Sequence, residues 1–206
     1  MSLSCTGVIL AGGENSRFSG RHKALMQIGG KRILDRIFEV VSGVFDDIIL
    51  VTNSPGQYLE WDATIVTDLL PVRSSLTGIY TGLFYARTDY AFFTASDTPF
   101  LKKEMIAAVV DGISPGIDIV MPETDQGREP LCAVYSRSCL ESARHNIETG
   151  RLKIMRTFRK KNIKIISNKA SRKADPRLLS FFNVNTPEDL QLAEAIARKT
   201  EDPDGY

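Results

Sequence analysis

The 206-residue sequence contains few cysteines and histidines, and this scarcity limits its chemistry. The three cysteines (Cys5, Cys132 and Cys139) form no Cys-x-x-Cys pair and are odd in number, so we expect a reducing, cytoplasmic setting. The two histidines, His22 and His145, belong to no Cys/His cluster at zinc-ligand spacing. A zinc site and a Ser-His-Asp hydrolase are therefore poorly supported by these residues.

Long apolar runs and a strong net charge are also missing. No stretch approaches 18 consecutive apolar residues, and the start of the chain lacks a basic-then-apolar pattern, so we expect neither a membrane span nor a signal peptide. A net charge of +1 argues against a general nucleic-acid or membrane-surface binder but allows a local basic pocket. With 43% hydrophobic residues, the chain predicts one globular domain over residues 1–206, with a frayed tail at 200–206.

The two commonest phosphate-binding loops are absent. Gly30 and Lys31 are followed by Arg32 rather than by Ser or Thr, so there is no Walker A motif, and no Gly-x-Gly-x-x-Gly motif occurs. A dinucleotide-binding interpretation is therefore unsupported.

A different glycine-containing loop follows the first apolar run, residues 8–10. It extends over about residues 11–22, whereas such loops usually take about 2–6 residues, and long loops of this kind often bind ligands. Glycines at 12, 13 and 20 allow backbone N–H groups to approach a ligand closely, while Arg17, Arg21 and Lys23 add positive charge. This composition predicts a phosphate-binding loop; the alternative is a surface loop with solvated charges.

Short β-branched runs alternate with segments of helical periodicity. We expect strands over residues 7–10, 47–52, 63–67, 90–95, 117–121, 130–135 and 163–167. We expect helices over residues 33–44, 77–87, 102–111, 136–146 and 151–160. A last helix begins with Thr186 as N-cap and Pro187 at its first position. This alternation predicts an α/β fold with a mostly parallel sheet covered by helices on both faces.

Polar residues follow several of the expected strands. Asn53, Asp68 and Asp97 each come just after an apolar run, and the first run leads into the glycine loop. Ligands of parallel sheets bind beyond the carboxyl ends of the strands, so these residues are expected to meet in one pocket. Asp97 has the chemistry of a Mg²⁺ ligand, or it caps the following turn. Lys23 either neutralises a phosphate or is solvated, and Asp68 either binds a base or sugar hydroxyl or caps a turn.

With these residues in view, the chain resembles the molybdenum cofactor guanylyltransferases, the MobA family of nucleotidyltransferases. The resemblance rests on motifs that run in the family's order over about residues 7–197. They are Leu10-Ala11-Gly12-Gly13, Arg17-Phe18-Ser19-Gly20, Lys23-Ala24-Leu25, Leu76-Thr77-Gly78-Ile79 with Gly82-Leu83, Ser96-Asp97-Thr98-Pro99-Phe100-Leu101, Glu129-Pro130-Leu131 and Asn183-Val184-Asn185-Thr186-Pro187-Glu188-Asp189-Leu190. The first motif marks the broad nucleotidyltransferase group, and the Asn-x-Asn-Thr-Pro ending makes the set more specific.

The resemblance implies a three-layer α/β/α, Rossmann-like nucleotidyltransferase fold and a Mg²⁺-dependent transfer of GMP from GTP to molybdopterin. It places Leu10, Ala11, Gly12, Gly13, Lys23, Asn53, Asp68 and Asp97 at the nucleotide, and Asn183 and Asn185 at the acceptor. Lys23, Arg17 and Asp97 would be the catalytic residues, with Asp97 holding Mg²⁺. GTP and molybdopterin are then the partners, with transient contact to other molybdenum cofactor proteins and with no nucleic acid or membrane.

The chain departs from the family pattern in the loop and before Leu76. His22 replaces the usual Asp, Phe18 replaces Met beside one extra residue near Ser19, and Ser74-Ser75 replaces Gly-Pro. These departures bear on loop geometry, rate and nucleotide preference.

Three other functions stay open. Relatives that use CTP tend to carry Leu-Ala-Ala-Gly, and Gly12 in place of the second Ala leaves room for a purine, which favours GTP over a cytidylyltransferase. A sugar-phosphate nucleotidylyltransferase fits the ending of the chain less well. A nucleotide-binding regulator that has lost catalysis is the alternative from another class.

Overall fold

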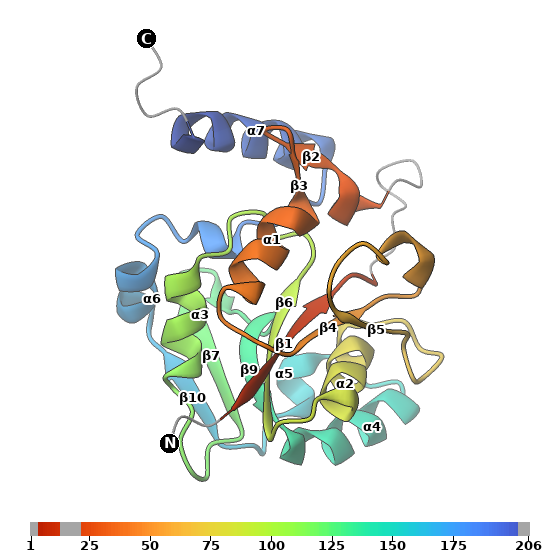
Figure 1. Cartoon of the computed structure of the whole chain (residues 1–206). Helices are drawn as coiled ribbons and strands as arrows, with labels where there is room; N and C mark the ends of the chain where they lie inside the picture. The colour runs from red at the N-terminus through yellow and green to blue at the C-terminus, as the bar shows by residue number, and fades with distance from the viewer. Residues whose placement is uncertain (1–3, 13–21, 202–206) are drawn as a thin grey trace.

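The computed structural model describes residues 4–12 and 22–201 (Figure 1). Its central eight-stranded sheet has the order β10-β7-β9-β6-β1-β4-β5, with β8 paired to β7. The strands of this sheet are β1 (Cys5–Leu10), β4 (Ile48–Val51), β5 (Thr64–Val66), β6 (Tyr90–Ala95), β7 (Ile119–Thr124), β8 (Gly127–Arg128), β9 (Cys132–Ser136) and β10 (Ile163–Ile166). A separate two-stranded hairpin joins β2 (Gln27–Ile28) to β3 (Lys31–Arg32).

Seven α-helices belong to the described part of the chain. They are α1 (Ile33–Ser42), α2 (Ser75–Tyr85), α3 (Lys103–Val110), α4 (Leu140–Glu148), α5 (Ile154–Thr157), α6 (Asn168–Ala174) and α7 (Pro187–Glu201). Short 3₁₀ turns add η2 (Lys23–Leu25), η3 (Pro55–Gln57), η4 (Arg137–Cys139) and η5 (Leu179–Phe181). Among these helices, none is both long and apolar enough to cross a membrane.

The sheet is mostly parallel, as the alternating pattern predicts. Within its main path, β9 is the reversed strand and pairs antiparallel with β6 and β7, while the other pairs are parallel. The chain runs from β1 outward to β4 and β5, then returns past β1 to β6. Ligands of open α/β sheets bind where the strand order reverses in this way. The carboxyl ends are level there, because Leu10 is opposite both Val51 and Ala95.

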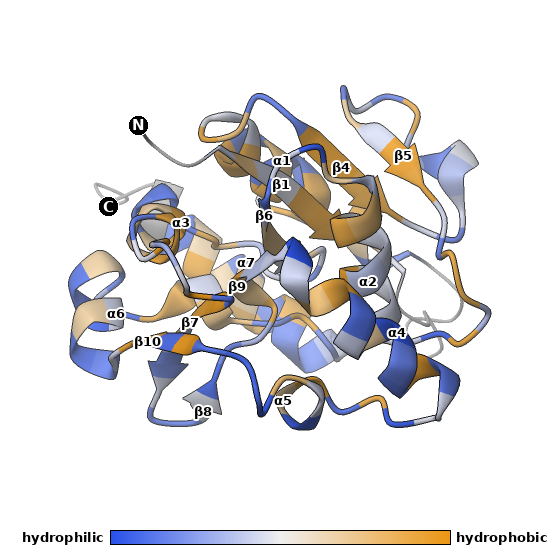
Figure 2. Ribbon diagram, turned by 90° about the horizontal axis from the view of Figure 1, so that it is seen from below, coloured by the Kyte–Doolittle hydropathy of each residue, from blue (hydrophilic) through white to orange (hydrophobic). Residues whose placement is uncertain are grey.

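Neighbouring strand residues supply two separate hydrophobic cores, one on each face of the sheet. Ile9 and Phe92 pack with α1, α3 and α7, whereas Val8 and Phe93 pack with α2, α4 and Phe158. Because successive side chains of a strand point to opposite faces, a continuous apolar run of this kind is buried on both sides. Figure 2 shows the hydrophobic strands between helices whose outer faces are hydrophilic. The helix–sheet–helix layers expected from the sequence are confirmed.

The structure differs from the sequence expectation most clearly between residues 151 and 160. The ten-residue helix expected there is a single turn, α5, and Lys161 N–H closes a further turn on Phe158. A continuous helix would place three cations three and four residues apart on one face, namely Arg156, Arg159 and Lys160. Like charges repel at this spacing. Among the strands and α-helices of the described residues, four short ones were not expected: β2, β3, β8 and α6.

Candidate functional site

A cavity of about 480 Å³ opens at the carboxyl ends of β1 and β6, beside β4. Backbone bonds continue the sheet into its wall: Ala11 N–H donates to Val51 O (2.8 Å), and Ser96 N–H donates to Leu10 O (3.0 Å). Eight of the expected site residues line this cavity: Leu10, Ala11, Gly12, Lys23, Asp68, Asp97, Asn183 and Asn185. Asn53 is outside the lining but contacts Asp68, while Gly13 and Arg17 fall outside the described residues.

Lys23 connects the centre of the cavity to the segment before α7. Its Nζ donates to Asp97 Oδ2 at 3.1 Å and to Asn185 Oδ1 at 2.9 Å. Both partners of the ion pair are largely buried, with 18% of the Lys23 and 21% of the Asp97 side chain exposed. Lys23 therefore interacts with residues on both sides of the cavity.

The other oxygen of Asp97 bears on the metal question. Asp97 Oδ1 is buried and has no hydrogen-bond partner within the described ranges, so the turn-capping alternative is not what the structure shows. A buried carboxylate oxygen without a donor is suited to a cation. Mg²⁺ is commonly bound by one or two carboxylates together with substrate phosphates. No group of three or more acidic, His or Cys side chains suited to a metal occurs in residues 4–12 and 22–201, and such a group is not needed here.

Asp68 forms a second polar centre together with Asn53. Asn53 Nδ2 donates to Asp68 Oδ2 at 2.8 Å, and Asp68 N–H donates back to Asn53 Oδ1 at 3.4 Å. Asp68 Oδ1 is buried without a partner among the described residues. Burial raises the pKa of Asp68 above its ordinary value, against the lowering effects of the Asn53 hydrogen bond and the Arg73 charge. This half-buried carboxylate therefore has a free acceptor for a ligand donor.

The segment that carries Asn183 and Asn185 is fixed by backbone bonds. Val184 N–H donates to Asp97 O at 2.9 Å, which ties this segment to the end of β6. Asp189 Oδ2 accepts from the N–H groups of Asn185 and Thr186, both at 2.8 Å, while Thr186 Oγ1 accepts from Asp189 N–H at 3.2 Å. This reciprocal cap confirms Thr186 as the N-cap of α7. The hydrogen bond from Asn185 N–H is the main cause of the lowered pKa of Asp189.

The start of α2 also lines the cavity, and sequence reasoning did not assign it to the site. Arg73, Ser74 and Ser75 stand there, and Ser74 Oγ accepts from Thr77 N–H at 3.1 Å as a helix cap. A serine before a run of helical apolar periodicity is an N-cap signal, and it predicts this helix start. A helix N-terminus carries partial positive charge, so Arg73 and α2 together favour an anion.

Gly78, in the first turns of α2, keeps that helix close to the sheet. A Cβ at Gly78 would lie 3.1 Å from Leu10 Cδ2, which is tighter than ordinary van der Waals contact. The glycine of the Leu-Thr-Gly-Ile motif therefore allows α2 to approach the end of β1.

The hydrolase alternative gains no support from the structure. Residues 112–116, Gly-Ile-Ser-Pro-Gly, have the Gly-x-Ser-x-Gly pattern of a hydrolase nucleophile. They form the turn between α3 and β7, however, at the amino ends of the parallel strands. The cavity lies at the opposite edge, and neither His22 nor His145 lines it.

Comparisons with known proteins point to one family. The chain is 47% identical to the molybdenum cofactor guanylyltransferase of Desulfosudis oleivorans, over 94% of this chain and 96% of that protein. It is 35% identical to a probable molybdenum cofactor guanylyltransferase of Natranaerobius thermophilus, over 98% of this chain and 100% of that protein.

Solved structures agree with these relatives. The molybdopterin-guanine dinucleotide biosynthesis protein A of Archaeoglobus fulgidus superposes with a TM-score of 0.83 at 29% identity, over 94% of this chain and 99% of that one. A 2-C-methyl-D-erythritol 4-phosphate cytidylyltransferase of Thermus thermophilus, at 15% identity and a TM-score of 0.69 over 96% and 100%, shares the fold. A model of the MobA-like NTP transferase domain matches residues 7–164, and this chain therefore belongs to that family.

Proposed function

We propose that this protein transfers GMP from GTP to molybdopterin and releases pyrophosphate. The observation that carries the proposal is the position of the Lys23–Asp97 ion pair between two polar groups of one cavity. Asp68 and Gly12 line it on one side, and Asn183 and Asn185 line it on the other. Relatives named as molybdenum cofactor guanylyltransferases support the choice of substrates.

The Asp68 side of the cavity suits guanine. Guanine presents its exocyclic amino group as a donor, and the buried, unpartnered Asp68 Oδ1 is the matching acceptor. Asn53 holds the other carboxylate oxygen and so fixes the orientation of Asp68. A Cβ added at Gly12 would project toward Asn53 Nδ2 at 3.7 Å, so a side chain there would take space next to this group. Cytosine carries an amino donor as well, so the preference for a purine rests on the space beside Gly12.

The reaction asks the protein mainly to position two phosphates and to neutralise charge. A terminal phosphate oxygen of molybdopterin forms a bond to the α-phosphorus of GTP, and the bond from that phosphorus to the β-phosphate oxygen breaks. The attacking phosphate is already ionised, so no base is required. Lys23 neutralises charge at the α-phosphate, Asn185 orients the acceptor beside it, and Arg17 contributes a further cation from the loop.

Asp97 is the residue that we propose to hold Mg²⁺, which would withdraw charge from the phosphate oxygens when bound. A protein of this fold, Rv0371C of Mycobacterium tuberculosis, was crystallised with manganese, so Mn²⁺ is the cation to compare with Mg²⁺.

The proposal is tested by nucleotide choice and by turnover. GTP, CTP and ATP are titrated separately with Mg²⁺ present, and pyrophosphate release is then followed after addition of molybdopterin, with Mn²⁺ and EDTA as parallel arms. We expect the tightest binding for GTP and metal-dependent release of one pyrophosphate per dinucleotide formed. Tighter binding of CTP would favour the cytidylyltransferase alternative, and GTP binding without turnover would favour the regulator.

A further inference from the structure

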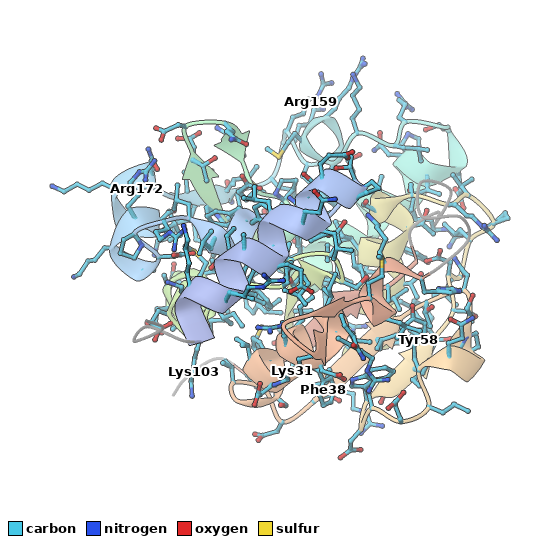
Figure 3. All side chains as sticks on the ribbon, turned by 90° about the horizontal axis from the view of Figure 1, so that it is seen from above. Lys31, Phe38, Tyr58, Lys103, Arg159 and Arg172 are labelled. Carbon is cyan, nitrogen blue, oxygen red and sulfur yellow. The ribbon has the colours of Figure 1, made fainter. Side chains whose placement is uncertain are left out.

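A second cavity, of about 400 Å³, lies against α4 and α5 and is lined by five cations: Arg151, Arg156, Arg159, Lys160 and Lys161. It shares no lining residue with the first cavity. Lys161 stands just before β10, which runs in the same direction as β6, so this part of the lining is at the amino edge of the sheet. In Figure 3, the labelled Arg159 lies at the rim of the molecule, far from Tyr58 of the first cavity.

The positive charge of this second cavity is only partly balanced by the protein, through the electrostatic interaction of Asp118 with Lys161. Among the described residues, no carboxylate oxygen lies within 4.0 Å of any of the five cations. Glu141 is the one acidic residue among those that line the cavity in the described part of the chain. Other basic side chains do form ion pairs, as Arg144 does with Glu148 and Arg172 with Asp125. Residues 149–174 contain ten Lys and Arg and no Asp or Glu, which leaves sixteen cations against twenty-five carboxylates in the rest of the chain.

Two of the cations are oriented by neutral groups. Arg151 Nε donates to Thr149 Oγ1 at 3.0 Å, and Arg151 Nη2 lies 3.1 Å from His145 Nε2. Because a guanidinium group has no acceptor, the imidazole nitrogen accepts in that contact. Lys161 Nζ donates to Ser138 O at 2.6 Å. Such partners restrict the side chains without cancelling their charge, and orienting groups before binding lowers the entropic cost of holding an anion.

We propose that this cavity binds an oligophosphate, a small anion with two or three linked phosphate groups. Its volume lies within the roughly 300–1,000 Å³ of small-molecule sites, and several cations around one concavity match several negative charges. Arginine forks bind phosphate oxygens in pairs. The hydroxyl group of Ser142 adds a neutral donor to the lining. Inorganic oligophosphate and the phosphate chain of a nucleotide share this chemistry, and the inference does not depend on the proposed function.

The test is calorimetric titration of the full chain with inorganic tripolyphosphate, in metal-free buffer of low ionic strength. It uses a Lys23→Ala background so that phosphate binding in the first cavity is weakened. In that background, Arg151→Ala with Arg156→Ala is expected to weaken binding at least tenfold, and Lys160→Gln, a mild change at an exposed position, a few-fold. Arg144→Ala is the matched control, because Arg144 is on α4 but pairs with Glu148 and is outside the lining. Thermal melting of each variant monitors folding.

Further arms identify the source of the phosphates and can overturn the proposal. Binding of GTP in the Lys23→Ala background, lost with the same cations, assigns the site to nucleotides; binding of tripolyphosphate without GTP assigns it to the inorganic anion. Equal tripolyphosphate affinity in the Arg151/Arg156 variant and the Arg144 control would overturn the site. So would cation-dependent binding of a polyglutamate peptide with no binding of tripolyphosphate, because the surface would then serve an acidic protein.

Discussion

Asp68 is a carboxylate whose surroundings disfavour its charge. Burial raises its pKa, so the folded chain holds a proton at Asp68 to a higher pH than the unfolded chain does. The native state therefore binds more protons. The stability of the fold falls as pH rises from the pKa of Asp68 in the unfolded chain to its raised pKa in the folded chain. A charge that burial disfavours in this way is typical of a residue that serves ligand binding rather than stability.

We expect Asp68→Asn to raise the melting temperature at pH 7 and to leave it nearly unchanged at pH 3, where the wild-type carboxyl is protonated. The same variant should weaken GTP binding, because an amide offers the guanine amino group one uncharged acceptor oxygen where the carboxylate offers two. Melting curves at both pH values, with GTP titrations at pH 7, check this. Asp62→Asn, at an exposed position, is the control; a lower melting temperature for Asp68→Asn at pH 7 would contradict the assignment.

Lys23→Ala should weaken GTP binding by about 1.5–3 kcal/mol, the loss expected for one charge-assisted contact, which is roughly a tenfold to hundredfold rise in Kd. Titration of GTP with Mg²⁺ present measures it. Lys31→Ala removes a lysine from the nearby hairpin, where it pairs with Glu39 and is outside the cavity, and should leave the affinity unchanged. Equal affinity in both variants would show that Lys23 does not contact the nucleotide phosphates.

Asp97→Asn should abolish transfer while leaving the fold intact, because an amide keeps the shape of the side chain but loses the charge that we assign to Mg²⁺. Circular dichroism reports the fold, and pyrophosphate release over a range of Mg²⁺ concentrations reports the chemistry. Metal-dependent turnover close to that of the wild type would remove Asp97 from the proposed metal site.

At the scale of elements, α2 owes its position to a glycine. A Cβ at Gly82 would lie 2.6 Å from Phe93 and 2.7 Å from Val8, both buried in the core. Replacing glycine by alanine inside a helix normally stabilises it by about 1 kcal/mol. The close packing reverses the sign here.

Gly82→Ala is expected to lower the free energy of unfolding by about 1–3 kcal/mol, the usual cost of overpacking a core. Urea unfolding gives the value. Gly56→Ala is the comparison, since nothing lies within 4 Å of a Cβ at that position; a Gly82→Ala protein as stable as the wild type would show that α2 can move away from the sheet without cost.

The regular elements were predictable from the sequence where apolar periodicity was strong. Strand β6 was expected with its observed bounds, and α1 and α3 were expected within two residues at each end. Hairpin β2–β3 was not, because two-residue strands carry no period and depend on Gly29 and Gly30, both at positive φ. The helix expected at 151–160 failed because periodicity takes no account of repulsion between cations.

The site was predictable to the extent that it depends on strand ends. Asp68 and Asp97 follow strands directly, so topology alone brings them to one edge. Arg73 and Tyr58 reach the cavity through loop and 3₁₀ geometry that no local pattern encodes. The segment from Phe18 to Arg21, where the chain departs from the family pattern, lies outside the described residues, so the expectations placed on it stay predictions.

For the whole molecule, all three cysteines are free thiols whose pKa is raised by burial. Burial raises the pKa of Cys5 to about 12 and that of Cys139 to about 11. The native protein therefore presents little thiolate at pH 8, and thiolate is the reactive form. The cytoplasmic setting and the single domain expected from the sequence stay predictions. Helix α7 runs to Glu201, and residues 202–206 of the expected tail fall outside the described ranges.

We expect iodoacetamide at pH 8 to label the native protein slowly and to label all three thiols rapidly in concentrated urea. Mass spectrometry over time gives both rates, with glutathione as the reference thiol. Rapid labelling of Cys132 or Cys139 under native conditions would show that β9 or η4 opens locally, without global unfolding.

The contacts of Lys23 and Val184 have a consequence for the order of events during turnover. One side chain and one backbone bond link Asp97, at the end of β6, to the segment that carries Asn185. A nucleotide that draws Lys23 toward its phosphates changes the surroundings of Asn185, and an acceptor held by Asn185 changes those of Lys23. Such coupling is reciprocal by thermodynamic necessity. We therefore expect the two substrates to alter each other's affinity by one shared factor, whichever of them binds first.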